Sequence, residues 1–513
     1  MKENEGQNTI VICSDEHHFR YSGYAGHPYV QTPNLDELAK DGAVFQRAYC
    51  PSPVCTPSRM GFITGKYVSQ IGSWFIGCPL DKRESTWASR LSAAGVHTTM
   101  LGKMDFCGPY QSGGFDDYRI IERRGAFKPY PRIAPLGSRT KDYVREDKLR
   151  HILHSGIRKD IQTDGRGGHD DELGFFDHDR MVTQWALDFL RAKEKKREKK
   201  PWVLYLGYLM PHWPYICPKE YFDLYYPNRV NMPFDCVMPE NERLHPAIRA
   251  FQRACNFKDV TQEDIRRVLA SYSGMITAMD GMIGQVLSEL KRQGIYENTN
   301  ILYTSDHGDS CGEHGLFYKQ CSYDGSAAVP LIVKGPCVQP GITVSTPVTL
   351  VDMYPTLLSL YGLSPEVDRP GKSWIPLLRG ESAYGMSYAF CEYHGNFFRD
   401  SWYMLLQDGF KYTYYVGDRP TLYNIEQDPH EMNDLAGEAD QVSRLVAFEK
   451  LLREILNPEE VDRKSKEDLG LIGKHGEDYT KELTYEQLQR GFIEGTFEYQ
   501  PEFAAFDDYE NEY

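Results

Sequence analysis

Two pairs of metal-ligating residue types stand directly after apolar runs that predict buried strands. Asp15 and Glu16 follow the run 9–13, and Asp306 and His307 follow the run 301–305. Because parallel strands bring their carboxyl ends to one edge of a sheet, we expect these side chains to meet there. Carboxylate oxygens suit Ca²⁺ or Mg²⁺, whereas an imidazole favours Mn²⁺ or another transition ion. The pairs therefore predict one divalent cation, with a capping or turn role as the alternative for each acidic residue.

A second chemical signature lies in segment 54–59, which reads Val-Cys-Thr-Pro-Ser-Arg. Its pattern Cys-x-Pro-x-Arg is the one at which a cysteine is oxidised to formylglycine after translation. A short motif arises by chance in a long chain, so its context has to decide. With that context, the motif predicts a hydrolase whose nucleophile is made from Cys55.

The elements that must position these residues alternate along the chain. Apolar runs at 9–13, 202–209, 300–305 and 330–334 predict buried parallel strands. Helical spacing fills the intervals: one helix is expected to start at Asp177 as N-cap, with Met181, Trp185 and Phe189 on its apolar face, and another to span 261–294. This alternation predicts an α/β fold with helices on both faces of the sheet.

The domain organisation follows from a change in pattern near residue 370. We expect a catalytic α/β domain over 1–370 and a smaller α+β subdomain over 371–457, where the turn Asp408-Gly409 joins two strands in a hairpin. A polar, then aromatic and acidic tail occupies 458–513. We expect this tail to pack against a neighbouring subunit of a homo-oligomer or to cover its own protomer.

Composition limits the classes of function. The 513 residues carry a formal net charge of -15, which disfavours nucleic acid and anionic membranes as partners. No apolar run reaches the ~20 residues of a membrane helix, and residues 1–5 are polar, so we expect a cytoplasmic protein unless an export signal has been removed. The 12 cysteines form no compact framework, which predicts reduced thiols.

A longer series of landmarks resembles the sulfatase branch of the alkaline phosphatase superfamily, and the resemblance covers nearly the whole chain. Its most similar members are the choline-sulfatase and phosphonate monoester hydrolase group. The fold implied is a mixed, largely parallel sheet sandwiched by helices. The landmarks are Asp15, the blocks 32–39, 55–59 and 64–67, Gly102-Lys103, the blocks 211–214, 305–308 and 312–315, Lys319, and the blocks 351–358 and 422–429.

The resemblance implies a mechanism that starts from formylglycine at Cys55. The aldehyde is hydrated to a gem-diol; one hydroxyl attacks sulfur and displaces the alcohol, and the other loses its proton as sulfate leaves and the aldehyde returns. The resemblance also implies one divalent ion, Ca²⁺ first and Mn²⁺ or Mg²⁺ as alternatives. Its ligands would be Asp15, Glu16, Cys55, Asp306 and His307, with Asp309 behind them.

Cationic side chains at family positions are implied to hold the sulfuryl group. Lys103, His212 and Lys319 would stabilise its negative charge, and His212 would contact or protonate the leaving group. Arg59 would anchor the formylglycine side chain. The alternatives are solvated surface lysines and a packed histidine.

The chain departs from the family two positions after Lys103. Relatives commonly carry a histidine there, and this chain carries Asp105. A carboxylate repels a sulfate oxygen unless it is protonated or paired, or else it binds a cationic or hydroxylated part of the substrate. His17, His18 or His169 could supply the missing imidazole, with a role as polar loop residues as the alternative for His17 and His18.

An insertion over about 110–178 is a basic island in an acidic protein. Its interpretations are a solvated charged loop or a wall over the site that recognises an anionic or sugar substrate. Its basic residues are Arg119, Arg123, Arg124, Lys128, Arg132, Arg139, Lys141, Arg145, Lys148 and Arg150.

Three functions fit these features. The first is hydrolysis of a small-molecule or carbohydrate sulfate ester after maturation of Cys55 by a formylglycine-generating enzyme. The second is hydrolysis of phosphonate monoesters or phosphodiesters on the same machinery, because these monoanions share the charge and tetrahedral shape of sulfate esters. The third is a binding protein that has kept the fold without catalysis, because a fold by itself does not establish a reaction.

Overall fold

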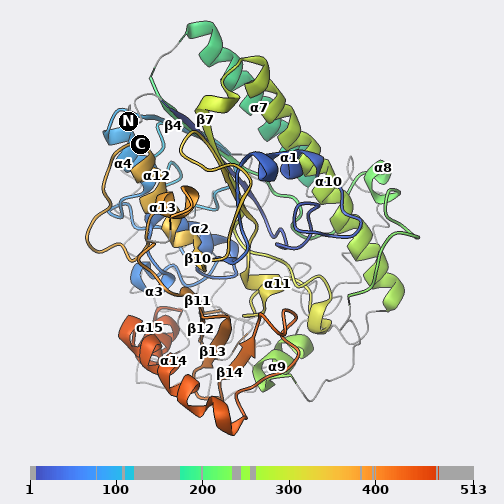
Figure 1. Ribbon diagram of the computed structural model, residues 1–513, viewed down its shortest axis with the longest axis vertical. Coiled ribbons are helices and arrows are strands. Elements are labelled where there is room, and N and C mark those ends of the chain that lie inside the picture. The colour runs from blue at the N-terminus through green and yellow to red at the C-terminus, as the bar shows by residue number, and fades with distance from the viewer. Residues whose placement is uncertain are drawn as a thin grey trace.

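The structure is a computed structural model that describes residues 7–76, 78–106, 110–120, 174–197, 200–233, 244–254, 261–381, 384–395, 398, 400–469 and 472. Its larger part is built around one sheet (Figure 1). This sheet has eight strands in the order β5-β4-β6-β1-β7-β8-β2-β9. The five strands from β5 to β7 are parallel to one another, β8 is antiparallel to both of its neighbours, β7 and β2, and β9 is parallel to β2. The sequence prediction of a mixed, largely parallel sheet is confirmed.

The strands of this sheet are short and mostly buried. Their bounds are β1 Asn8–Ser14, β2 Ala43–Phe45, β4 His97–Gly102, β5 Asp117–Arg119, β6 Trp202–Gly207, β7 Thr299–Ser305, β8 Leu331–Lys334 and β9 Ile342–Val344. A separate pair joins β3 Ala48–Tyr49 to β10 Val348–Thr349. The expected buried strands at 9–13, 202–209, 300–305 and 330–334 correspond to β1, β6, β7 and β8.

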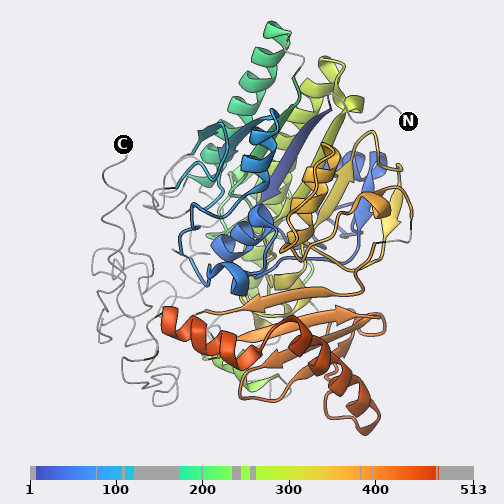
Figure 2. The same cartoon turned by 90° about the vertical axis from the view of Figure 1, so that its left-hand side faces the viewer.

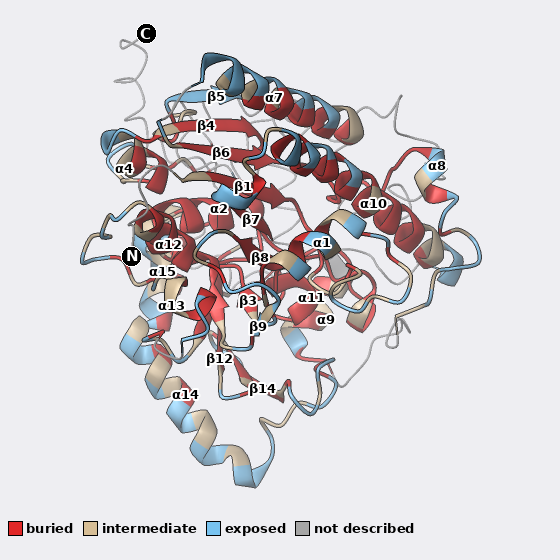
Figure 3. Ribbon diagram, turned by 45° about the horizontal axis from the view of Figure 1, so that its top comes forward, coloured by how far each residue is buried: buried red, intermediate tan, exposed pale blue. Residues whose placement is uncertain are grey.

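Helices cover both faces of the sheet, and the two-residue period of β1 shows why. Ile10 and Ile12 pack into one hydrophobic cluster, while Val11 and Cys13 pack into the other. The first cluster is closed by α1 Pro33–Asp41, α7 Phe175–Lys196 and α10 Gln262–Arg292, and the second by α2 Cys55–Thr64, α4 Trp87–Ala93 and α12 Met353–Leu360. Figure 3 shows α7 and α10 with their buried sides toward the sheet.

Helix α7 differs from its prediction in two respects. It begins at Phe175 after Gly174, whose φ of 52° lies in the left-handed region, so Asp177 falls within the first turn instead of capping the helix. Its buried face includes Val182 and Ala186, whereas Met181 is 40% exposed. The predicted face was off by one position: Trp185 and Phe189 pack against the core but lie half-buried at its rim, and only Met181 of the three is exposed.

The carboxyl-terminal part forms a smaller sheet with its own core (Figure 2). Four antiparallel strands, β11 Ala389–Tyr393, β12 Trp402–Gln407, β13 Phe410–Tyr415 and β14 Thr421–Asn424, follow in sequence order. Asp408 and Gly409 both have positive φ values, of 49° and 75°, which confirms the predicted tight hairpin turn. The boundaries at 370 and 457 stay predictions.

The remaining elements are short or lie at the rim of the two sheets. The helices are α3 Val68–Ile71, α8 Lys219–Phe222, α9 Pro246–Ala254, α11 Asp324–Ala327, α13 Ile375–Leu378, α14 Val442–Ile455 and α15 Pro458–Asp468. The 3₁₀ turns are Tyr296–Asn298, Glu313–Gly315, Leu350–Asp352 and Ala439–Gln441.

The carboxyl ends of the central strands lie at one edge of the sheet and carry the candidate residues. Ser14 of β1 pairs with Ser305 of β7, so Asp15 and Asp306 leave the sheet side by side. Gly102 of β4 pairs with Gly207 of β6. A Cβ at Gly207 would lie 1.9 Å from the carbonyl oxygen of Lys103, so only glycine lets Lys103 approach this closely.

Several expectations concern residues outside the described ranges. Of the basic island, Arg119 lies in β5, and the other nine basic residues lie outside the described residues, as do His169 and 473–513. Within the described ranges, nine cysteines are free thiols, in agreement with the prediction of reduced cysteines. No helix in this described part has the length and hydropathy needed to cross a membrane.

Candidate active site

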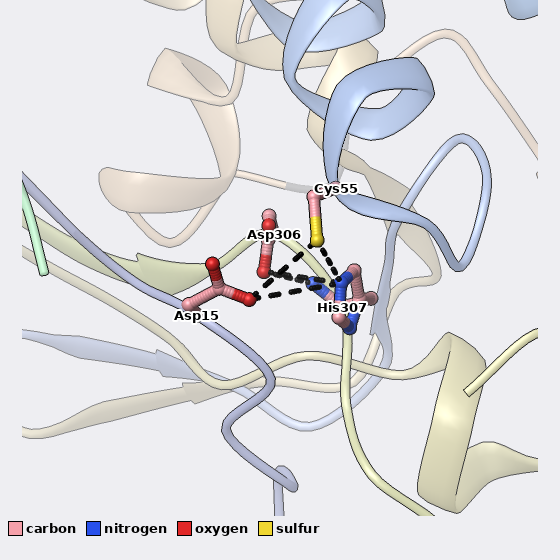
Figure 4. A group of neighbouring side chains, drawn as sticks. All are labelled: Asp15, Cys55, Asp306 and His307. Atoms are coloured by element: carbon pink, nitrogen blue, oxygen red, sulfur yellow. Dashed lines mark hydrogen bonds and ion pairs between the residues drawn. The ribbon is translucent and has the colours of Figure 1, made fainter. Parts of the chain in front are cut away.

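Four buried side chains from three elements converge on one point (Figure 4). Asp15 follows β1, Asp306 and His307 follow β7, and Cys55 is the first residue of α2. One ligand atom from each lies within 4.8 Å of the others. The Cys55 Sγ lies 3.7 Å from Asp15 Oδ1 and 3.3 Å from His307 Nε2. The sequence prediction that two strand ends and the cysteine segment form one site agrees with this geometry.

The two carboxylates of this group each turn one oxygen inward and one toward a cation. Asp15 Oδ1 and Asp306 Oδ1 lie 3.9 and 3.6 Å from His307 Nε2. Asp306 Oδ2 accepts a hydrogen bond from Arg59 Nε at 2.8 Å, and Asp15 Oδ2 accepts one from Lys103 Nζ. The inward oxygens face the shared point, where they can act as ligand atoms for a metal ion, and Asp306 Oδ1 also accepts hydrogen bonds from the amides of Glu16 and His307.

His307 is held as a neutral ligand. Its Nδ1 lies 3.0 Å from the carbonyl oxygen of Gly308, so Nδ1 carries the proton and the Nε2 lone pair faces the group. Burial lowers the pKa of His307 to about 4. Two carboxylate oxygens and a neutral imidazole in a fully buried group fit a divalent cation.

Arg59 is the fully buried cation of this framework. Its guanidinium donates to Asp306, to the carbonyl oxygen of Lys103 at 2.7 Å and to Tyr205 Oη at 2.9 Å. Burial opposes its charge, but Asp306 and its other neighbours hold the pKa of Arg59 well above its usual range. Because Arg59 follows Cys55 by one turn of α2, it ties the helix start to the carboxylates. Direct anchoring of formylglycine by Arg59 stays a prediction.

A second buried group borders the first on the side of Lys319. Lys319 Nζ lies 2.7 Å from Glu16 Oε2, 2.7 Å from His212 Nε2 and 3.7 Å from Cys55 Sγ. His212 Nε2 lies 3.2 Å from Glu16 Oε2. Burial raises the pKa of Glu16 well above its usual range, and Lys319 opposes that rise. Glu16 thus lies outside the four-residue group, and its role as a metal ligand stays a prediction.

Cationic side chains lie on both sides of the Cys55 thiol. Lys319 contacts the sulfur directly, and Lys103 contacts Asp15, whose Oδ1 faces the sulfur. Burial and the negative charge of Asp15 raise the pKa of the Cys55 thiol to about 12. The unmodified side chain is therefore a neutral thiol at pH 7, which is a weak nucleophile.

Asp105 is paired with neighbours of the site. Its Oδ2 accepts a hydrogen bond from Thr56 Oγ1 at 3.1 Å, and its Oδ1 lies 3.7 Å from Lys103 Nζ. Its backbone has a φ of 63°, in the left-handed region, and its side chain is 22% exposed. The carboxylate thus meets the condition that it be paired, while its contact with substrate stays a prediction.

The two histidines considered as replacements for the missing imidazole point elsewhere. His17 Nδ1 lies 2.5 Å from Tyr303 Oη and its Nε2 lies 3.0 Å from the carbonyl oxygen of Tyr21. His18 Nδ1 accepts from the amide of Arg20, and its Nε2 lies 3.5 Å from Glu313. Both rings therefore bind partners outside the group around Cys55.

Three supporting residues were not identified from the sequence. Tyr205 donates to the carbonyl oxygen of Lys103 from inside an apolar strand, and Ser58 Oγ donates to the carbonyl oxygen of Asp306 at 2.6 Å. Tyr215 Oη donates to Asp309 at 2.6 Å and keeps that carboxylate behind Glu16. A tyrosine in an apolar run is typical of a core, so only its hydroxyl partner reveals the role.

Comparison with known proteins agrees with this geometry. The Sulfatase family model matches residues 7–363, and the model for the C-terminal part of N-sulphoglucosamine sulphohydrolase matches residues 312–458. A choline-sulfatase of Rhizobium meliloti (strain 1021) is 30% identical over 455 residues, covering 86% of this chain and 85% of that protein. Arylsulfatase K of Danio rerio is 30% identical over 477 residues, covering 88% and 84%.

A solved structure extends the comparison to three dimensions. The phosphonate monoester hydrolase of Agrobacterium radiobacter matches with a TM-score of 0.68 and 25% identity, covering 87% of this chain and 95% of that one. The mixed sheet, with a carboxylate, imidazole and thiol centre at its edge, defines an enzyme of the alkaline phosphatase superfamily. Within it, the chain belongs to the sulfatase family and is a sulfatase.

Replacing Arg59 by glutamine tests how far the site depends on its buried cation. Removing the cation of a buried ionic group leaves the Asp306 carboxylate without its partner, while Asp15 keeps Lys103, so we expect the free energy of unfolding to fall by about 3 to 5 kcal/mol. Denaturant unfolding monitored by circular dichroism measures this. The matched control is Arg453→Gln, which breaks an exposed pair with Glu459 and should change stability little. Equal effects of the two changes would contradict the interpretation.

Proposed function

We propose that this sulfatase hydrolyses an O-sulfate ester with formylglycine at Cys55 as the nucleophile and one divalent cation beside it. The observation that carries the proposal is the position of Cys55. The motif cysteine is the first residue of a buried helix, and its sulfur lies among Asp15, His307 and Lys319. Relatives named choline-sulfatase and arylsulfatase K support sulfate esters as the substrate class.

The cation would be held by Asp15, Asp306 and His307, together with the modified side chain of Cys55. When bound, it would supply positive charge that favours loss of a proton from a hydroxyl nucleophile and offsets charge on the sulfuryl oxygens. Ca²⁺ is the first candidate because oxygen ligands predominate once Cys55 carries oxygen, and Mn²⁺ or Mg²⁺ are the alternatives.

Each side chain around Cys55 would then have a separate role in the reaction. A hydroxyl group of hydrated formylglycine releases its proton to solvent as its oxygen forms a bond to sulfur, and the bond from sulfur to the alcohol oxygen breaks. Lys103 and Lys319 stabilise the charge on the sulfuryl oxygens, and the contact pair Lys319 and His212 supplies the proton to the leaving alcohol. The second hydroxyl then returns a proton to this pair, the carbon–oxygen bond breaks as sulfate leaves with the electron pair, and water hydrates the aldehyde that forms again.

A second candidate function is hydrolysis of phosphonate monoesters or phosphodiesters. The observation that favours it is the match to a phosphonate monoester hydrolase structure over 95% of that chain. These substrates are tetrahedral monoanions, as sulfate esters are, and the same cations would bind them. Sulfate esters are preferred here because the relatives matched at 30% identity are named sulfatases.

The first prediction concerns Cys55 itself. After co-expression with a formylglycine-generating enzyme, peptide mass spectrometry should show Cys55 converted to the aldehyde, and the protein should release sulfate from a panel of choline, aryl and sugar sulfates. Cys55→Ala should remove activity, because no nucleophile remains, while Cys50→Ala at a nearby buried cysteine should keep it. Full conversion with turnover of phosphodiesters alone would support the second function, and an unconverted thiol in an active enzyme would refute the mechanism.

The second prediction concerns the cation. Dialysis against a chelator should abolish activity, and Ca²⁺, Mn²⁺ or Mg²⁺ should restore it, with the ion identified by elemental analysis. Asp306→Asn should reduce the bound metal, because it removes one of the two inward carboxylate charges. The control Asp309→Asn, whose carboxylate binds Tyr215 and the Cys311 amide, should keep its metal. Undiminished metal in Asp306→Asn would contradict the ligand assignment.

The third prediction concerns Asp105. If its carboxylate binds a cationic part of the substrate, Asp105→Asn should raise KM for choline sulfate by about tenfold, which corresponds to a loss of about 1.4 kcal/mol of binding free energy. KM for an aryl sulfate whose leaving group carries no cation should rise less than threefold, because the lost attraction acts only on a cation. Equal changes for both substrates would exclude this role and assign Asp105 to the pairing with Lys103.

A further inference from the structure

A buried aspartate of α7 holds the backbone that leads to His212. Asp179 is fully buried, and its carboxylate accepts hydrogen bonds from the amides of Leu209 at 2.7 Å and Met210 at 2.9 Å. His178 Nδ1 lies 2.8 Å from the same carboxylate. The motifs at the ends of β1 and β7 do not include Asp179, and it lies in a helix that the sequence analysis assigned to the core.

The two peptides that Asp179 holds are connected directly to the site. The amide of His212 donates to the carbonyl oxygen of Leu209 at 3.0 Å, which closes a turn. The carbonyl oxygen of Met210 accepts from the amide of Asp15 at 3.3 Å. The segment between β6 and His212 is therefore fixed on one side by Asp179 and on the other by the loop after β1.

A second contact from α7 reaches the His212 ring itself. Phe175, in the first turn of the helix, lies edge-on to the imidazole, with ring centroids 6.0 Å apart and an interplanar angle of 82°. At the other end of the imidazole, Nε2 faces Lys319 and Glu16. Helix α7 thus supports both the backbone and the ring of His212.

The amides of Leu209 and Met210 need the Asp179 carboxylate as an acceptor because they lie beyond the end of β6. The last hydrogen bond in the pattern of the sheet runs from the amide of Tyr208, just after β6, to the carbonyl oxygen of Cys13 in β1. The next two amides are buried, and a buried amide requires an acceptor. One carboxylate supplies an acceptor oxygen to each, whereas an asparagine amide would present its NH₂ group to one of them.

We propose that Asp179 is a positioning residue for His212, acting through the Leu209 and Met210 amides. The inference rests on the proposed role of His212 at the leaving group. It assigns part of the catalytic geometry to a helix that contributes no metal ligand and no cation to the groups described above. Supporting residues of this kind typically alter activity by about 10- to 100-fold when changed.

The test compares Asp179→Asn with a matched control in the same fold. Asp280→Asn changes another buried carboxylate that accepts two backbone amides, those of Asn34 and Leu35 at 3.1 and 2.8 Å, at the start of α1. Both variants are made in the full chain, matured in the same way and checked by thermal unfolding. We expect both to lose stability, and only Asp179→Asn to lower kcat by about 10-fold or more with KM within threefold.

A double-mutant cycle identifies the route of the effect. In the His212→Ala background, Asp179→Asn should lower kcat by less than threefold, because the group that it positions is already absent. A full and multiplicative loss in that background would overturn the proposal. An equal loss of kcat in Asp280→Asn would also overturn it, because the effect would then be one of general stability.

A readout that needs no turnover separates this inference from the proposed function. In protein with isotope-labelled histidine, the His212 ring signals in the nuclear magnetic resonance spectrum should move in Asp179→Asn and stay in place in Asp280→Asn. Assignment of these signals uses their loss in His212→Ala. Unmoved signals in Asp179→Asn would refute positioning. Moved signals in a protein that releases no sulfate would support positioning and refute the proposed function.

Discussion

The balance of buried charge at the edge of the sheet is the constraint on which the rest of the structure depends. Ionised groups removed from water are stable only when they are paired and hydrogen-bonded. Here three carboxylates meet three cations, and every one of these side chains is buried: Asp15, Glu16 and Asp306 against Arg59, Lys103 and Lys319. Each pair joins segments that are distant in sequence, so the site exists only when the strands, α2 and the following loops are all in place.

This charge balance also explains how the site keeps ligand atoms available. Because Arg59 and Lys103 each bind an outer carboxylate oxygen, the inner oxygens of Asp306 and Asp15 face His307 and Cys55. Burial keeps the imidazole neutral, and the contact with the Gly308 carbonyl places its proton on Nδ1. The group of Asp15, Asp306, His307 and Cys55 therefore fits a divalent cation. The second group, around Lys319 and His212, lies on the side where we propose that the leaving group binds.

The supports of the site come from elements that carry no motif. Tyr205 in β6 holds Arg59, and the helix α7 holds the segment before His212 through Asp179 and Phe175. These residues have ordinary core positions by sequence pattern, because a buried tyrosine or aspartate is recognised only by its partner. The prediction for the buried face of α7 was off by one position for a different reason: half-buried aromatic residues at the rim have the same spacing as a core stripe.

The sequence by itself determined the fold class, the family and the candidate residues that the fold brings together after β1, after β7 and at the start of α2. It did so because apolar runs with acidic ends, and the motif around Cys55, are local patterns. Only the tertiary structure decided which oxygen of each carboxylate faces inward, that Glu16 pairs with Lys319, and that Asp105 pairs with Thr56 and Lys103. Those outcomes depend on strand register and on contacts across up to 303 positions of sequence, which no local pattern encodes.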